Sequence, residues 1–148
     1  MANRQLFLEA ATTAQLVGRI VDAQLEAVGV PGYLLALLTH VRDLEPVSPT
    51  AVSLASGAPP TTLRDNIQRL VERGLVERVS NPDDGRSYLL ALTRAGKAVT
   101  EAAGEALHGA YLELERHLPK PLRAYEQVLD ELNAALEAMV GDETPASG

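Results

Sequence analysis

The chain of 148 residues contains no cysteine. This absence excludes disulfide bonds, zinc sites built from thiolates, and redox sensing through cysteine oxidation. The sequence also lacks any run of about 18 consecutive apolar residues, so no membrane-spanning helix is expected. The N-terminal segment MANRQLFLEAATTAQ has no basic stretch followed by a long apolar one, which predicts a helix rather than a signal peptide. We therefore expect a bacterial-type cytoplasmic protein.

Motifs that would mark an enzyme are also missing. The sequence contains no HExxH, GxSxG, phosphate-binding loop or dinucleotide fingerprint. Its three histidines are His40, His108 and His117, and the last two fall on opposite sides of one helix. Glu113 and His117 have a spacing that can hold a metal but more often forms an exposed polar pair. We expect neither catalysis nor a bound metal or cofactor.

Charge is unevenly distributed along the chain. The formal net charge is -7, which at first argues against a nucleic-acid partner. The segment from Thr61 to Lys97, however, holds seven basic and five acidic residues, a net of +2, and the remainder has a net of -9. Affinity for DNA depends on the local field at the phosphates rather than on the total charge. The pattern is typical of a molecule with a DNA-binding end and an acidic distal end.

The remaining pattern predicts a mainly α-helical fold with one β-hairpin. Apolar residues recur at helical spacing, and glycine, proline and capping residues separate the segments. Ser48-Pro49 and Thr93 are expected helix starts, and Gly29, Gly57 and Gly74 are expected stops. We expect helices at about residues 4–28, 32–44, 49–56, 60–73 and 94–118, a last one reaching about residue 140, and strands at 75–79 and 87–92.

The helix from Pro60 to Arg73 is the candidate recognition helix for DNA. Placing Leu63 at zero on a helical wheel brings Ile67, Leu70 and Val71 within roughly 80 degrees of it, which predicts a buried face. The opposite face is polar near its N-terminus, the end from which recognition helices contact bases. Its candidate DNA-binding residues are Thr61, Thr62, Arg64, Asp65, Gln68 and Arg69.

These side chains suit different parts of a duplex. The threonines can contact a thymine methyl group or a phosphate, Gln68 can pair with adenine, and the arginines suit guanine or phosphate. Asp65 could accept from a cytosine amine, although a carboxylate near phosphates lowers affinity. An ordinary solvated helix face explains the same pattern equally well.

The hairpin that follows carries the second candidate DNA contact. Asn81-Pro82-Asp83-Asp84-Gly85 is dense in turn-forming residues, and Arg86 and Ser87 come directly after it. A guanidinium at a hairpin tip can enter a narrow minor groove, where the potential is most negative. The two aspartates either hold Arg86 by a local ion pair or build the turn. A surface arginine in a loop is the simpler interpretation of Arg86 alone.

Together these segments resemble the MarR family of bacterial winged helix-turn-helix regulators. The resemblance rests on three motifs in the family's order and spacing: LVERGLVER from Leu70 to Arg78, DDGR from Asp83 to Arg86, and LTRAG from Leu92 to Gly96. The helix layout extends the likeness across nearly the whole chain. It implies a winged helix-turn-helix with long N- and C-terminal dimerisation helices and a double-stranded operator DNA as partner.

A stripe in the last helix predicts a dimer interface. Apolar residues recur at steps of three and four, a narrow seam of the coiled-coil kind, at Leu122, Tyr125, Leu129, Leu132, Leu136 and Met139. Packing within one subunit is the alternative. The family resemblance implies a homodimer, with residues 1–30 and 94–140 as dimerisation region, residues 31–93 as DNA-binding lobe and residues 141–148 as a disordered tail.

The resemblance also implies a small, often anionic aromatic or phenolic ligand bound between the dimer helices and the lobe. Tyr33, Leu37 and His40 lie on one helix face, and Arg42 and Tyr111 could complete such a pocket. Core packing is the simpler role for Tyr33 and Leu37. We thus expect a ligand-responsive repressor that binds a pseudo-palindromic operator as a homodimer. The alternative is a winged-helix protein-interaction module with weak or degenerate DNA binding.

Overall fold

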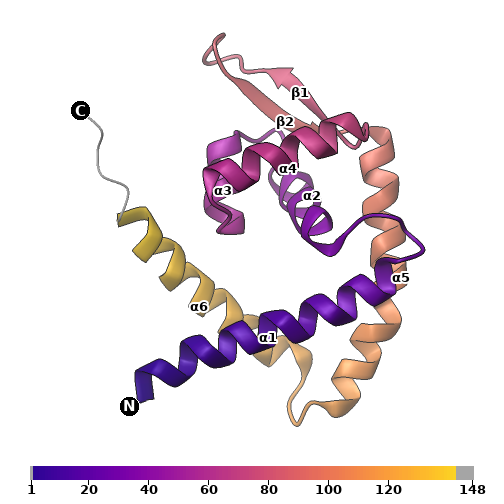
Figure 1. The fold of residues 1–148 in the computed structure, drawn as a ribbon, viewed down its shortest axis with the longest axis vertical. Helices are drawn as coiled ribbons and strands as arrows, with labels where there is room; N and C mark the ends of the chain where they lie inside the picture. The colour runs from indigo at the N-terminus through magenta and orange to yellow at the C-terminus, as the bar shows by residue number, and fades with distance from the viewer. Residues whose placement is uncertain (1, 143–148) are drawn as a thin grey trace.

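The computed structural model describes residues 2–142 of the chain. These residues form six helices and a two-stranded sheet (Figure 1). The elements are α1 (Ala2–Leu25), α2 (Gly32–Leu44), α3 (Pro49–Ser56), α4 (Pro60–Glu72), β1 (Val76–Ser80), β2 (Tyr88–Leu92), α5 (Arg94–His117) and α6 (Leu122–Asp142). The predicted fold class, mainly α with a two-stranded β wing, is confirmed.

The C-terminal ends of α1 and α6 differ from the predicted bounds by two residues or more. Helix α1 stops at Leu25 rather than near Val28, because the Val28 and Gly29 amides both donate to the Leu25 carbonyl and Gly29 takes a φ of 75°. Helix α6 continues through Asp142, so the predicted tail includes two residues that are helical. The rest of that predicted tail, residues 143–148, lies outside the described residues.

The wing is an antiparallel hairpin with one additional bridge. Strands β1 and β2 pair in a register that runs from Val76 opposite Leu92 to Ser80 opposite Tyr88. Val47, in the connection between α2 and α3, exchanges both backbone hydrogen bonds with Leu90, at 3.1 and 2.8 Å. A single bridging residue has no periodicity, so the sequence did not predict it.

The hydrophobic core lies inside the winged-helix lobe. Figure 1 shows α2, α3, α4 and the wing gathered together, while α1 and the second half of α5 extend away from them. Leu38 and Val41 of α2, Val52 of α3, Leu70 of α4 and Leu90 of β2 are fully buried in this core. No helix among residues 2–142 is long and apolar enough to cross a lipid bilayer.

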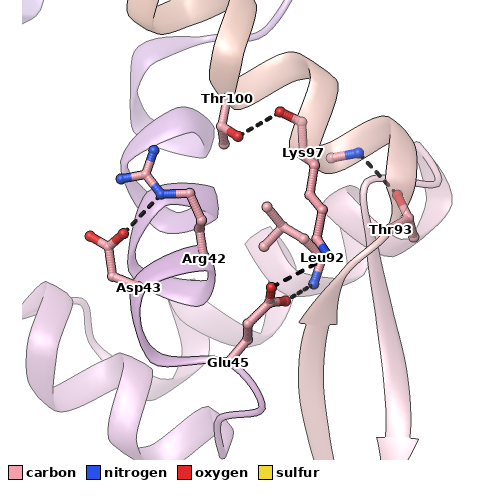
Figure 2. Close-up of polar contacts among 8 residues, drawn as sticks. Arg42, Asp43, Glu45, Leu92, Thr93, Lys97 and Thr100 are labelled. Atoms are coloured by element: carbon pink, nitrogen blue, oxygen red, sulfur yellow. Dashed lines mark hydrogen bonds and ion pairs between the residues drawn. The ribbon is translucent and has the colours of Figure 1, made fainter.

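The junction between the wing and α5 is held by a compact polar network (Figure 2). The Glu45 carboxylate accepts from the Leu92 amide and lies 3.9 Å from the Lys97 ammonium. The Thr93 hydroxyl accepts from the Gly96 amide at 3.0 Å, which caps α5, and donates to the Gly74 carbonyl at 2.6 Å. The end of α4, the end of β2 and the start of α5 are therefore fixed to one another.

Candidate nucleic-acid interface

Helix α4 presents one face to the core and the other to solvent. Proline occupies its first position, where the missing amide hydrogen costs nothing, and Gly74 ends it with a φ of 69°. The side chains of Leu63, Ile67 and Leu70 are at most 3% exposed, as the helical wheel predicted. Val71 is partly buried against them.

The first two turns of α4 offer a free polar surface. Thr61, Thr62, Arg64 and Asp65 are all exposed, and none of them makes a side-chain hydrogen bond within the described part of the chain. Because α4 begins here, its unpaired backbone amides also face this end. This surface has the geometry that base and phosphate contacts from a recognition helix require.

Gln68, in contrast, is already engaged inside the protein. Its amide nitrogen donates to Glu72 at 2.9 Å, and its amide oxygen accepts from Arg78 of β1, also at 2.9 Å. The Arg78 guanidinium in turn lies 5.1 Å from the centre of the Tyr88 ring on β2. Adenine recognition by Gln68 stays a prediction, and it would require this residue to exchange both partners for a base edge.

Arg69, in the last turn of α4, and Arg73, directly after the helix, also have partners within the chain. Nη1 of Arg69 donates to the Tyr33 hydroxyl at 2.8 Å, and Nη1 of Arg73 donates to the Gly29 carbonyl at 3.2 Å. Sequence reasoning assigned Arg69 to DNA and gave Arg73 no role. Their partners lie more than thirty residues away along the chain, so no local signal could have revealed them.

The wing tip is a turn built by asparagine and aspartate side chains. Asp84 Oδ1 accepts from the Arg86 amide and Asn81 Oδ1 accepts from the Asp83 amide, each at 3.0 Å. The Ser87 hydroxyl accepts from Asn81 at 2.9 Å and donates to the Asp84 carbonyl at 3.2 Å. Of the two roles predicted for Asp84, the structure shows the turn-building one. Arg86 is exposed at this tip, while the hydroxyl of Ser87 is committed to the turn.

Helix α4, the β1–β2 hairpin and the order of the elements around them agree with those of a known protein family. A family model described as MarR family matches residues 32–87, which span α2, α3, α4 and the wing tip. Residues 32–87 form a MarR-family domain. A sequence search of curated proteins finds no match to the chain.

Solved structures of MarR-family regulators share this fold. A mutant MarR from E. coli complexed with operator DNA is 23% identical, with a TM-score of 0.76 over 86% of this chain and 93% of that one. MOSR from M. tuberculosis, in complex with DNA, is 21% identical with a TM-score of 0.73 over 89% and 96%. CouR from Rhodococcus jostii, bound to p-coumaroyl-CoA, is 21% identical with a TM-score of 0.71 over 97% and 94%. The likeness extends beyond the MarR domain into α1, α5 and α6.

The lobe contains a cavity bordered by three of the residues predicted for a ligand pocket. Tyr33, Leu37 and His40 of α2 line a space of about 420 Å³ together with Thr62 and Asn66 of α4. The three α2 residues predicted to lie on one helix face thus border the same cavity. Whether a ligand binds there stays a prediction.

Two of the residues predicted for the pocket, Arg42 and Tyr111, lie away from this cavity. Arg42 is exposed and bonds its neighbour Asp43 at 2.8 Å (Figure 2). Tyr111 lies far along α5 and is 51% exposed. Neither lines the cavity, because Arg42 points from the other side of α2 and Tyr111 lies beyond the stretch of α5 that packs on the lobe.

A larger cavity lies between the lobe and α6, a helix of the predicted dimerisation region. It measures about 880 Å³ and lies between α3, the start of α4 and the last turns of α6. Leu54, Leu63, Leu136 and Val140 give it a mainly apolar lining, and His40 borders both cavities. Apart from His40, its lining residues were not predicted, because α3 and α6 approach each other only in the folded chain.

Most of the exposed apolar surface lies on the long helices. Leu129 is 50% exposed, whereas Leu122, Tyr125, Leu132 and Leu136 of the predicted stripe are partly buried within the subunit. The stripe thus contributes to packing within the chain as well as to an outer surface. Further exposed apolar side chains on these helices are Leu6, Phe7, Leu8, Leu16, Val17, Ile20, Leu112, Leu114, Val128, Met139 and Val140.

His117, the last residue of α5, lies on the surface beside Glu113 and Arg116. His117 Nδ1 lies 2.9 Å from the Glu113 carbonyl oxygen and 3.6 Å from its carboxylate, which also pairs with Arg116. Among the described residues, no group of three or more histidine, aspartate or glutamate side chains could hold a metal ion.

Proposed function

We propose that the chain is a sequence-specific DNA-binding transcriptional regulator, and that it acts as a ligand-responsive repressor on a pseudo-palindromic operator. The observation that carries this proposal is the unoccupied polar surface at the start of α4 beside an exposed Arg86 on the wing, in a MarR-family domain. MarR-family proteins are DNA-binding regulators rather than enzymes. A helix in the major groove with an arginine at the flank would use both features.

We further propose that the regulator is a homodimer formed by residues 1–30 and 94–140. The support is α1, in which every residue from Gln5 to Val17 is exposed, including Leu6, Phe7 and Leu16. A contiguous apolar surface of this kind is normally buried against a partner. A second copy of the same helices offers a complementary surface, and a twofold dimer would bring two recognition helices to two half-sites about one DNA turn apart.

Replacing Arg86 with alanine should weaken binding to most DNA sequences alike. The guanidinium would neutralise backbone charge rather than recognise a base, so its loss should flatten the plot of log affinity against log salt by about one unit for each wing on the DNA. Fluorescence anisotropy at several salt concentrations measures both effects. Arg116→Ala, which removes the same charge from the far end of α5, is the matched control and should change neither.

Unchanged affinity and salt slope in the Arg86 variant would show that the wing does not contact DNA. If the wild-type chain itself selected no sequence from a random duplex library, the protein-interaction alternative would be favoured. Asp65 supports that alternative, because an exposed carboxylate on the recognition helix opposes phosphate binding.

We propose that an anionic aromatic or phenolic compound releases the DNA by binding in the cavity beside Tyr33, Leu37 and His40. That cavity lies between α2 and α4 and combines an aromatic ring, an alkyl side chain and a polar imidazole. CouR, a protein of the same fold, is bound to p-coumaroyl-CoA. A ligand that favours one arrangement of the lobe over another shifts the DNA-binding equilibrium.

Titrating phenolic acids into the protein–DNA complex tests this proposal. We expect His40→Ala to need a higher concentration of compound for release, because the variant loses a polar contact inside the cavity. Tyr111→Phe, which lies outside the cavity, should behave as wild type. Equal release from His40→Ala and wild type would place the binding site elsewhere.

A further inference from the structure

The second half of α4 is attached to the corner between α1 and α2 by two arginines. Arg69 donates to the hydroxyl of Tyr33, at the start of α2, and Arg73 donates to the carbonyl of Gly29, in the corner itself. The two arginines are four residues apart and therefore lie on one face of α4, one turn from each other. The C-terminal end of the recognition helix is thus joined to this corner by two hydrogen bonds, in addition to the packing of its buried face.

The corner to which they attach is packed into the core and hydrogen-bonded. Leu25 and Val30, on either side of it, are 2% and 6% exposed and belong to the core. The Gly32 amide donates to the Asp22 carboxylate at 3.0 Å, which fixes α2 against the last turn of α1. A β-carbon at position 32 would lie 2.7 Å from Oδ1 of Asp22, so the start of α2 approaches α1 closely here. Movement of α1 relative to the lobe would have to break these contacts.

Beyond this corner, α1 becomes the exposed apolar helix that we assign to the dimer. Val17 and Ile20, each 52% exposed, lie eight and five residues before Leu25 on the same helix. The arginine contacts therefore form a short route from the recognition helix to the proposed dimer interface. A shift of α4 relative to this corner would change the separation of the two recognition helices in the dimer.

We propose that Arg69 and Arg73 are positioning residues that set the half-site spacing accepted by the dimer. The proposal rests on the proposed function. Each base pair added between half-sites moves one of them by about 3.4 Å and rotates it by about 34° around the helix axis. A dimer with rigidly held recognition helices fits one spacing, whereas a dimer with loosely held helices tolerates several.

The competing interpretation is that both arginines bind phosphates. Tyr33→Phe separates the two, because it removes only the hydroxyl that accepts from Arg69 and leaves every charge in place. A phosphate-binding Arg69 would retain its contact and its salt dependence in this variant. A positioning Arg69 would lose its anchor.

The experiment begins with selection of binding sequences from a random duplex library by the wild-type protein. Affinities are then measured for duplexes in which the selected half-sites are moved closer or farther by one and two base pairs. We expect wild type to lose affinity sharply at changed spacings, and Tyr33→Phe and Arg73→Ala to lose much of that preference. Arg64→Ala, on the same helix but without such an anchor, should lower affinity in the same proportion at every spacing.

A salt slope equal to wild type in Tyr33→Phe supports the positioning role. A Tyr33→Phe spacing profile identical to that of wild type would overturn it while the proposed function stands. Loss of salt dependence in Tyr33→Phe would also overturn it, since no charge has been removed.

A measurement without DNA makes failure of the inference distinguishable from failure of the proposed function. Because the chain has no cysteine, Asp65→Cys gives a single site for a nitroxide label on each recognition helix. Pulsed electron paramagnetic resonance on the dimer should show a narrow distance distribution that broadens in Tyr33→Phe and Arg73→Ala. An unchanged distribution refutes the positioning role. If the distribution broadens in the two variants but the wild-type protein selects no DNA, the proposed function is refuted. The two arginines are then still supported as determinants of lobe orientation.

Discussion

Gly96→Ala is expected to destabilise the fold by about 3 kcal/mol, at the upper end of the usual cost of overpacking. A β-carbon at this position would lie 2.0 Å from the Leu75 carbonyl oxygen, and a backbone atom cannot move aside as a flexible side chain can. The start of α5 would have to shift and loosen the hydrogen bond from the Thr93 amide to the same carbonyl, now 3.1 Å. Thermal unfolding should show a melting temperature roughly 10 °C lower, given about 2–4 °C per kcal/mol for a chain of this size.

Gly104→Ala provides the matched control within the same helix. Gly104 is exposed in the middle of α5, and nothing lies within 4 Å of the β-carbon it would gain. Alanine should therefore stabilise the helix by about 0.5–1 kcal/mol. Equal melting temperatures for the two variants would mean that the close approach of α5 to Leu75 does not exist in solution.

Val17→Glu is expected to weaken the proposed homodimer about a hundredfold or more. An unpaired carboxylate in an apolar interface costs several kcal/mol, and each 1.4 kcal/mol is a factor of ten in the dissociation constant. The twofold symmetry of the dimer introduces the charge twice. Light scattering coupled to size-exclusion chromatography should show a monomer at concentrations where wild type is a dimer, and DNA affinity should fall with it.

The control places the same charge on the other side of the helix. Gln15 is exposed two residues from Val17, about 200 degrees around α1, and is polar already. Gln15→Glu should leave the dimer intact. A Val17→Glu protein that elutes as a folded dimer would remove α1 from the interface, and Leu129→Glu would then test whether α6 alone forms it.

Local features of this fold were predictable from the sequence because each depends on a few neighbouring residues. Ser48 accepts from the Ala51 amide and Thr93 from the Gly96 amide, as their positions before helical segments indicate. Gly57 and Gly74 adopt positive φ at helix ends, where other residues are strained. The glycine of the LTRAG motif has a physical reason as well, because a β-carbon at position 96 would overlap the Leu75 carbonyl oxygen.

The hydrogen bonds that hold residues in and around the candidate site in place were not predictable, because they join residues far apart in the chain. The Glu45 carboxylate reaches the Leu92 amide across 47 residues, and Arg69 reaches Tyr33 across 36. A helical wheel shows which face of α4 is polar, but it cannot show which polar groups already have partners. The wheel likewise does not show that Arg42 pairs with its neighbour Asp43.

The solvent-facing surface of α1 links the stability of the protein to its own concentration. If this helix is ordered by a second copy, unfolding and dissociation are one equilibrium, and the law of mass action applies to both. Each tenfold dilution then removes about 1.4 kcal/mol from the free energy that keeps the assembled form together. Occupancy of an operator would rise more steeply than the amount of protein, so a cell could switch the regulated gene by modest changes in how many copies it makes.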